Sequence, residues 1–172
     1  VTLLTLLLCV CAGSVYVPPL TTIGSILGLS RDPMAASIIL SVRLPRVLSV
    51  MMSGAMLAVS GGATQGLLRN PLADGSTFGV SAGASLGATL SIALGLAIPG
   101  FAGGATALMA VVFAFLSLAL ILGLAARLDG TLSTNTIILV GVIFTMFANS
   151  IISLIVTFAG DRVRTIMFWT MG

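Results

Sequence analysis

Long apolar stretches separated by short polar turns make up most of the chain. A membrane-spanning helix needs about 20 apolar residues, and five stretches approach or exceed that length. We expect spanning helices over Val1 to about Val17, Val47 to Leu68, Phe78 to Ile98, Ala102 to Ala126 and Thr136 to Phe158. Every Arg and Asp falls outside these stretches. This supports the division, because an Arg at mid-bilayer depth costs on the order of 3 kcal/mol.

The piece between the first two stretches, residues 18–46, is too broken by Gly and Pro to cross a membrane. Within it, Asp32 and Pro33 form a helix start, with Asp32 as N-cap and Pro33 at the first helical position. We expect an interfacial helix from Met34 to Val42 that ends at Arg43 and Arg46. The pattern as a whole predicts an all-α, polytopic membrane helical bundle with a single transmembrane domain over residues 1–172, truncated at both ends.

Two of the stretches carry small residues at every fourth position. These positions are Gly54, Ala58, Gly62 and Gly66 in the second stretch, and Gly79, Gly83, Gly87, Ser91 and Gly95 in the third. Four-residue spacing places each series on one helix face, where small side chains let two helix backbones approach closely. We therefore expect both helices to be packed against neighbours. The alternative, that Gly is simply common in membrane helices, explains the number of glycines but not two registers of this length.

The fifth stretch carries a polar stripe with the same spacing. Its members are Gly141, Thr145, Asn149, Ser153 and Thr157. An amide at mid-membrane depth needs hydrogen-bonding partners or water, so Asn149 is the strongest member. The pattern alone leaves two interpretations equally open: the stripe hydrogen-bonds to another helix, or it lines a water-filled path.

Composition excludes several function classes. The chain of 172 residues is 58% hydrophobic and only 6% charged, whereas soluble domains carry about 25% charged residues. There is no Lys, Glu or His, so a general base would have to be one of four Asp, each with a simpler role in a turn or helix end. The net charge of +3 is too small and scattered for nucleic-acid binding. Cys9 and Cys11 are expected to be packing residues, not metal ligands.

The distribution of arginines predicts how the chain is oriented in the membrane. Alternating spans place five arginines on one side of the membrane and Arg69 and Arg127 on the other. The five are Arg31, Arg43, Arg46, Arg162 and Arg164. The positive-inside rule assigns the five-arginine side to the cytoplasm.

Four motifs together resemble the first half of the FecCD-type permease family, the membrane subunits of ABC importers for iron-siderophores, haem and cobalamin. They are R-L-P-R at 43–46, S-G-A at 53–55 with S-G at 60–61 and Q-G at 65–66, R-N-P-L-A-D at 69–74 followed by G-V-S-A-G-A at 79–84, and L-S-T at 132–134 with F-W-T-M-G at 168–172. Two departures fall at one turn, where Gly75 replaces a usual Pro and Phe78 a usual Leu. Family members have about twice this length and about ten helices.

The resemblance implies a fold, a function and partners. It implies half of a ten-helix permease with the second stretch threaded through the middle, acting in an ABC importer for iron-siderophore complexes or related bulky chelates in a bacterial or archaeal cell membrane. It further implies a second permease subunit, an ATP-binding subunit that uses the ATP, and a solute-binding protein, with no cofactor bound directly. The alternatives are a channel or secondary transporter subunit, and a structural membrane subunit.

The resemblance also implies site residues. It favours a translocation path lined by Thr145, Asn149 and Ser153, and it makes the second-to-third and fourth-to-fifth turns a cytoplasmic gate. It places Arg43 and Arg46 outside the cell, where they pair with the solute-binding protein, against the charge rule. Simple turn chemistry at Asn70 and anchoring of the arginines among lipid headgroups are the alternatives. The gate residues it implies are Asn70, Leu72, Ser133, Thr134 and Asn135.

Overall fold

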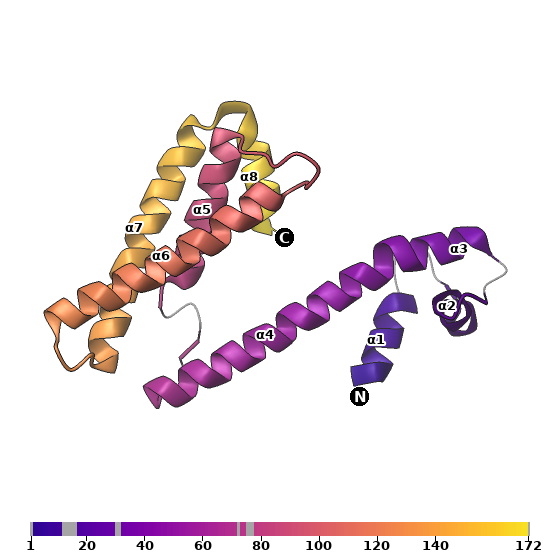
Figure 1. Ribbon diagram of the computed structural model, residues 1–172, viewed down its shortest axis with the longest axis horizontal. Coiled ribbons are helices and arrows are strands. Elements are labelled where there is room, and N and C mark those ends of the chain that lie inside the picture. The colour runs from indigo at the N-terminus through magenta and orange to yellow at the C-terminus, as the bar shows by residue number, and fades with distance from the viewer. Residues whose placement is uncertain (1, 12–16, 30–31, 72, 75–77, 172) are drawn as a thin grey trace. The chain divides into compact units, whose positions relative to one another are not determined.

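The computed structural model describes residues 2–11, 17–29, 32–71, 73–74 and 78–171, and these are helical apart from turns and one isolated bridge (Figure 1). The all-α fold class predicted from the sequence is confirmed. The elements are α1 (Thr2–Cys11), α2 (Pro19–Ile26), α3 (Pro33–Ile38), the π-turn η1 (Ile39–Arg43), α4 (Leu44–Leu68), α5 (Val80–Leu94), α6 (Gly104–Leu128), α7 (Thr134–Phe158), the 3-10 turn η2 (Gly160–Arg162) and α8 (Val163–Met171).

Three helical stretches among the described residues are long and apolar enough to cross a membrane. They are Pro33–Leu68, Gly104–Leu128 and Thr134–Phe158, with mean hydropathies of 1.5, 2.7 and 2.3. The apolar helix α5 is shorter, with 15 residues. Lengths and hydropathies of this kind identify a multi-pass membrane protein.

The helix that starts at Asp32 continues much further than the sequence pattern predicted. The Asp32 carboxylate accepts hydrogen bonds from the backbone N–H groups of Met34 and Ala35, at 3.0 and 3.2 Å, as an N-cap does. The predicted end at Arg43 and Arg46 is wrong, because α3, η1 and α4 follow one another without a break. A proline ring clashes with the carbonyl four residues earlier, and the π-turn, which ends at Arg43 two residues before Pro45, widens the helix there.

Helix α5 is shorter than the predicted stretch from Phe78 to Ile98. It begins after Gly79 and ends before Gly95, and both glycines have left-handed backbones with φ of 69° and 67°. Because glycine adopts this conformation without a Cβ penalty, Gly95 ends the helix ahead of the predicted stop at Pro99. Fifteen residues of α-helix extend only about 22 Å, less than the roughly 30 Å of a bilayer core.

The chain forms two compact units, Val1–Val59 and Ser60–Gly172. In the first, four buried side chains form a core, and Leu44 and Val47 pack against it. The core members are Val10, Val17, Ala35 and Ile39. The expectation of one transmembrane domain over residues 1–172 stays a prediction.

Arg43 joins two helices of the first unit. Its Nη1 donates hydrogen bonds to the carbonyl oxygens of Val10 and Cys11, at 3.0 and 3.1 Å. These carbonyls lie in the last turn of α1, where a helix has no backbone donors left to satisfy them. A cation at this position also interacts favourably with the helix dipole, so Arg43 acts as a C-terminal cap for α1.

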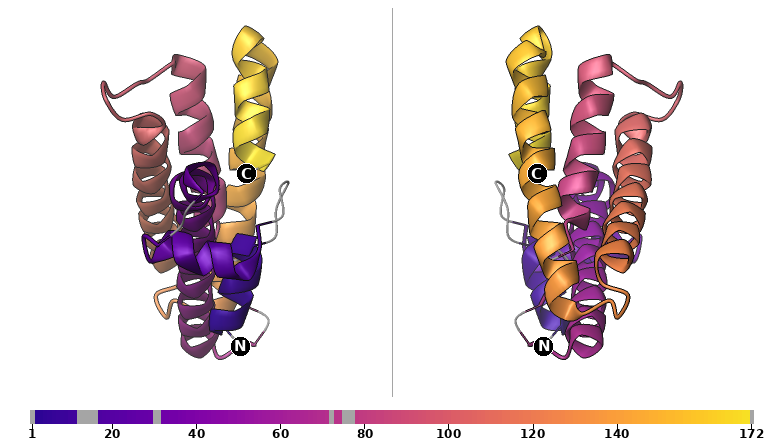
Figure 2. Two further views of the ribbon diagram at one scale, coloured as in Figure 1. Left: turned by 90° about the vertical axis from the view of Figure 1, so that its right-hand side faces the viewer. Right: turned by 90° about the vertical axis from the view of Figure 1, so that its left-hand side faces the viewer.

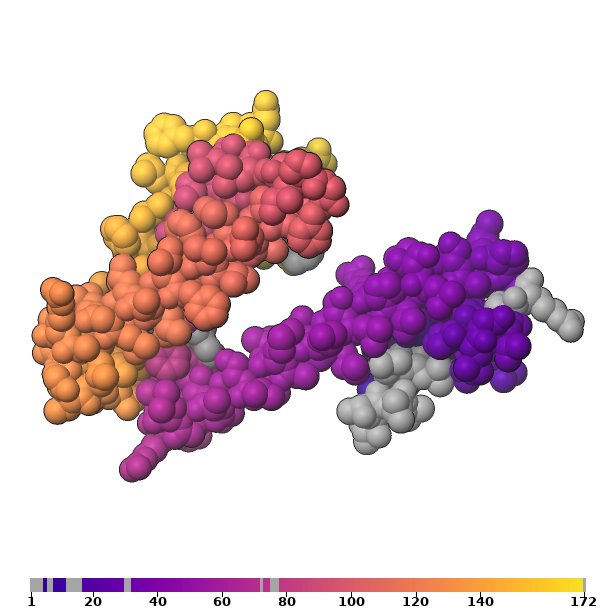
Figure 3. All heavy atoms as spheres, viewed as in Figure 1, coloured from indigo at the N-terminus to yellow at the C-terminus, as the bar shows by residue number. Residues whose placement is uncertain are grey.

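In the second unit, α5 lies between α6 and α7, as both views in Figure 2 show. The core between α6 and α7 consists of Ile121, Ala125, Ile137 and Val140, with Phe78 and Phe144 packed against it. The atoms of α5 and α6 lie directly against one another in the space-filling view (Figure 3). This core thus holds together α6 and α7, the two helices on either side of the predicted fourth-to-fifth turn.

The small residues of α5 occupy its contact with α6. A Cβ at Gly87 would overlap the backbone carbonyl oxygen of Met109, and one at Gly83 would lie 2.9 Å from the backbone oxygen of Phe113. A Cβ at Gly79 would lie 3.0 Å from the backbone oxygen of Gly141 in α7. These positions therefore permit backbone-to-backbone approach.

The small residues of α4 have different surroundings. A Cβ at Gly54, Gly62 or Gly66 would meet no atom of the described residues within 4 Å, and Ala58 is exposed. Tight packing along this face of α4 stays a prediction.

Candidate functional site

The predicted polar stripe lies along one face of α7 and changes from buried to exposed along the helix. Gly141 is buried, Thr145 is half-buried, and Asn149, Ser153 and Thr157 are exposed. The hydroxyl of Thr145 donates to the carbonyl oxygen of Gly141, and that of Thr157 to the carbonyl oxygen of Ser153, both at 2.8 Å. The threonines thus satisfy their hydroxyl protons within the helix, and the exposed side chains of Asn149 and Ser153 can contact another molecule.

The first predicted gate follows α4. Asn70 is half-buried; its N–H donates to the carbonyl oxygen of Gln65 at 3.2 Å, and its own carbonyl accepts from the N–H of Ala73 at 3.1 Å. Ala73 is only 2% exposed, so this turn folds back onto the protein. Leu72, the second residue predicted here, lies outside the described residues.

The second predicted gate connects α6 to α7. Ser133 is the N-cap of α7, and its Oγ accepts from the N–H of Thr136 at 3.4 Å. Thr134 begins the helix and is half-buried, while Asn135 is exposed. The structure therefore brings these three predicted residues together at the start of α7.

Asp129 organises this second turn, a role the sequence interpretation missed. Its carboxylate accepts from the N–H and hydroxyl of Thr131 at 3.0 and 2.7 Å, from the N–H of Ser133 at 3.2 Å, and from the hydroxyl of Thr136 at 3.2 Å. Hydrogen bonds from Ser133 and Thr131 hold the pKa of the Asp129 carboxyl well below its usual range. The available signal was an Asp followed by hydroxyl residues at Thr131, Ser133 and Thr136.

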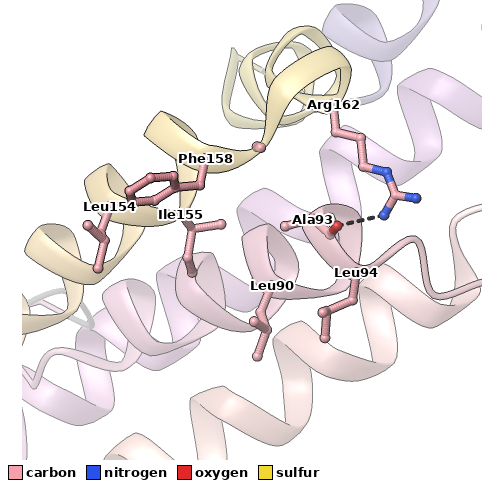
Figure 4. Close-up of a pocket in the computed structure, with 8 residues that line it drawn as sticks. Leu90, Ala93, Leu94, Leu154, Ile155, Phe158 and Arg162 are labelled. Atoms are coloured by element: carbon pink, nitrogen blue, oxygen red, sulfur yellow. Dashed lines mark hydrogen bonds between the residues drawn. The ribbon is translucent and has the colours of Figure 1, made fainter.

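An open apolar cleft of about 370 Å³ lies between the C-terminal ends of α5 and α7. Leu90, Ala93 and Leu94 line one side, and Leu154, Ile155 and Phe158 line the other (Figure 4). Arg162 also lines it.

Arg162 caps α5 across 70 residues of sequence. Its Nη1 donates to the carbonyl oxygens of Ala93 and Ile92, at 2.6 and 3.2 Å (Figure 4). These carbonyls belong to the last turn of α5, where a cation is favourable. The sequence places Arg162 shortly after the fifth apolar stretch but gives no indication of which helix it contacts.

We expect Gly95→Ala to destabilise the second unit more than Gly100→Ala. Both glycines have positive φ, of 67° and 79°, so alanine brings a backbone cost of about 1–2 kcal/mol at each. Only at Gly95 would the new Cβ also lie 2.6 Å from Nη1 and Nη2 of Arg162, which displaces the guanidinium from its hydrogen bonds to α5; at Gly100 it meets nothing within 4 Å among the described residues. Thermal unfolding midpoints in detergent compare the two variants. Equal losses would mean that the Arg162 contact contributes no stability.

The described helices and their polar groups define a multi-pass helical membrane protein with a polar face on α7. Comparison with known proteins gives the family: the FecCD transport family matches residues 1–172. The chain belongs to this family.

Curated relatives and a solved structure support the same family assignment. An "Uncharacterized ABC transporter permease protein YvrB" of Bacillus subtilis is 37% identical over 143 residues, covering 83% of this chain and 40% of the relative. The "Vitamin B12 import system permease protein BtuC" of Klebsiella pneumoniae is 35% identical over 172 residues, covering 99% of this chain and 48% of the relative. A structure of an inward-facing ABC transporter, assigned to the metal-chelate type, matches with a TM-score of 0.77 and 30% identity, covering 99% of this chain and 50% of that one.

The chain thus spans about half the length of the curated relatives it matches. These relatives are named as permease proteins, which supports the expectation of a membrane component without its own catalytic site.

Proposed function

We propose that this chain is the N-terminal half of the permease subunit of an ABC importer that passes an iron-siderophore complex or a related bulky chelate across a bacterial or archaeal cell membrane. The observation that carries the proposal is the family match over residues 1–172. The relatives' printed names, which include vitamin B12 import and a metal-chelate type transporter, support a bulky chelate as cargo.

The translocation path in this proposal runs along the polar face of α7. Thr145, Asn149 and Ser153 line it, because they follow one helix face and become progressively exposed. Two hydroxyls and one amide offer weak, uncharged contacts. Such contacts suit transport, since a site that binds its cargo strongly releases it slowly.

Partner subunits supply the remaining functions. A separate ATP-binding subunit hydrolyses ATP, because the chain has no Gly-rich phosphate loop with a Lys. A second permease subunit, in a homodimer or pseudo-dimer, forms the other wall of the path, and a solute-binding protein docks on the side that carries Arg43 and Arg46. The turns at Asn70–Leu72 and Ser133–Asn135 form the cytoplasmic gate.

A cysteine substituted for Asn149 tests the path. In the full-length permease, reconstituted with its ATP-binding subunit, Asn149→Cys is expected to react with a water-soluble thiol reagent, since only a hydrated thiol ionises readily. Phe147→Cys is the matched control: Phe147 is also exposed on α7 but lies about 200° around the helix. We expect the thiol at position 149 to react at least about tenfold faster than the thiol at position 147.

Labelling is measured without nucleotide, with ATP and with a trapped ATP state, and background from Cys9 and Cys11 is subtracted using the parent protein. Protection of the Asn149→Cys variant in every state would contradict the path.

Uptake of ferric siderophore, haem and cobalamin by the same vesicles, measured in parallel, identifies the cargo class.

A further inference from the structure

The turn between α6 and α7 is held by one carboxylate. Asp129 accepts four hydrogen bonds of 2.7 to 3.2 Å, two through Oδ1 from Thr131 and two through Oδ2 from Ser133 and Thr136. The hydroxyls of Ser133 and Thr136 are also 2.9 Å apart. Both carboxylate oxygens are therefore needed: one shapes the turn and the other fixes the first turn of α7.

The backbone of this turn is one that the sequence alone would not favour. Leu132 has a φ of 50°, in the left-handed region that side chains other than Gly and Asn rarely adopt. Such a conformation persists where surrounding contacts over-determine it. The N–H groups of Thr131 and Ser133, on either side of Leu132, both donate to Asp129. The carboxylate therefore holds the residues before and after the strained one in place.

The clamped segment leads directly into the residues of the proposed gate. The backbone N–H of Ser133 donates to the Asp129 carboxylate, which positions Ser133, and Thr134 and Asn135 follow it in the first turn of α7. We propose that Asp129 is the positioning residue of the cytoplasmic gate: its carboxylate, through Thr131, Ser133 and Thr136, fixes where Ser133, Thr134 and Asn135 lie. This inference rests on the proposed function, because it names the residue that sets the gate's geometry.

Substitution by asparagine tests the carboxylate while keeping its shape. All four contacts donate into Asp129, and an amide has only one accepting oxygen. Asp129→Asn therefore leaves an NH₂ group facing either the donors of Thr131 or those of Ser133 and Thr136. Thr131→Val removes only the 2.7 Å hydroxyl contact and is the milder variant. Asp161→Asn is the control, since Asp161 is an exposed carboxylate at η2, outside this turn.

The experiment uses the full-length permease with its ATP-binding subunit in proteoliposomes. Two quantities are measured for each variant: ATP hydrolysed per cargo molecule transported, and labelling of an Asn135→Cys reporter by a water-soluble thiol reagent in the absence of nucleotide. We expect Asp129→Asn to raise both by at least about threefold, with Thr131→Val intermediate and Asp161→Asn unchanged. A purely structural role would instead lower assembly, hydrolysis and transport together.

The outcomes separate this inference from the proposed function. If labelling of the Asn135→Cys reporter depends on nucleotide but Asp129→Asn changes neither labelling nor coupling, Asp129 is not the positioning residue and the gate stands. If the reporter is labelled equally in every nucleotide state, this turn is not a gate. That result would contradict both the gate in the proposed function and the role of Asp129. If Asp129→Asn does not assemble, Thr131→Val decides: parental coupling and labelling overturn the proposal, and a rise in both supports it.

Discussion

Gly87→Val is expected to destabilise the second unit by about 3 kcal/mol, the upper end of the usual overpacking cost. A Cβ at this position would overlap the backbone carbonyl oxygen of Met109 and lie 2.7 Å from the Cβ of Phe113. Neither atom belongs to the flexible end of a side chain, so relief requires α5 and α6 to move apart. Because close approach drives helix association inside a membrane, separation removes much of what holds the pair together.

The measurement is the thermal unfolding midpoint in detergent, together with the fraction of protein that elutes as a single species. Gly123→Val in α6 is the matched control, since a Cβ there meets nothing within 4 Å among the described residues. Its change is expected to stay within about 0.5 kcal/mol. Equal destabilisation by the two substitutions would mean that α5 and α6 do not approach each other at Gly87.

The packing of α5 illustrates what a sequence pattern predicts well. Recurrence every four residues is a local property that fixes a helix face whatever surrounds it. Gly83 and Gly87 accordingly share one face, and that face lies against α6. The N-cap at Asp32 was equally predictable, because the capping acceptor and its donors lie within three residues.

The contacts at the helix ends were less predictable because distant residues make them. Helix α5 stops at Gly95 beneath the guanidinium of Arg162, which is far away in the sequence. No local pattern relates these two residues. The join between α3 and α4 was missed for a different reason: Arg43 and Arg46 indicated the end of an interfacial helix, whereas the helix continues through the π-turn into α4.

In the candidate site, too, some features were predictable from the sequence and others were not. The register of Thr145, Asn149 and Ser153 on α7 follows from spacing alone, and so does their shared face. The role of Asp129 depends on the backbone turning back at Leu132, so that donors two, four and seven residues later converge on one carboxylate. Asp129 followed by Gly130 indicated a turn, but its four hydrogen bonds became visible only in three dimensions.

Charge reversal at the two arginines of the R-L-P-R motif is expected to affect thermal stability differently. Arg43 is half-buried and bonded to two carbonyls of α1, whereas Arg46 is exposed one turn further along. Arg43→Glu would place a carboxylate against carbonyl oxygens, and losing charge-assisted hydrogen bonds typically costs about 1.5–3 kcal/mol each. We therefore expect a lowered unfolding midpoint for Arg43→Glu and an unchanged one for Arg46→Glu.

The proposed docking of a solute-binding protein is expected to depend on Arg46 and not on Arg43. An exposed arginine–carboxylate pair contributes up to about 1 kcal/mol, and reversal turns attraction into repulsion, so Arg46→Glu is expected to weaken binding about tenfold or more and mainly to slow association. Surface plasmon resonance on the reconstituted full-length permease, at low and high salt, measures this directly, with Arg69→Glu, directly after the other end of α4, as the control. Parental affinity for Arg46→Glu would place the docking surface elsewhere. If Arg43→Glu kept its thermal stability but lost binding, Arg43 would be a docking residue and its contact with α1 dispensable.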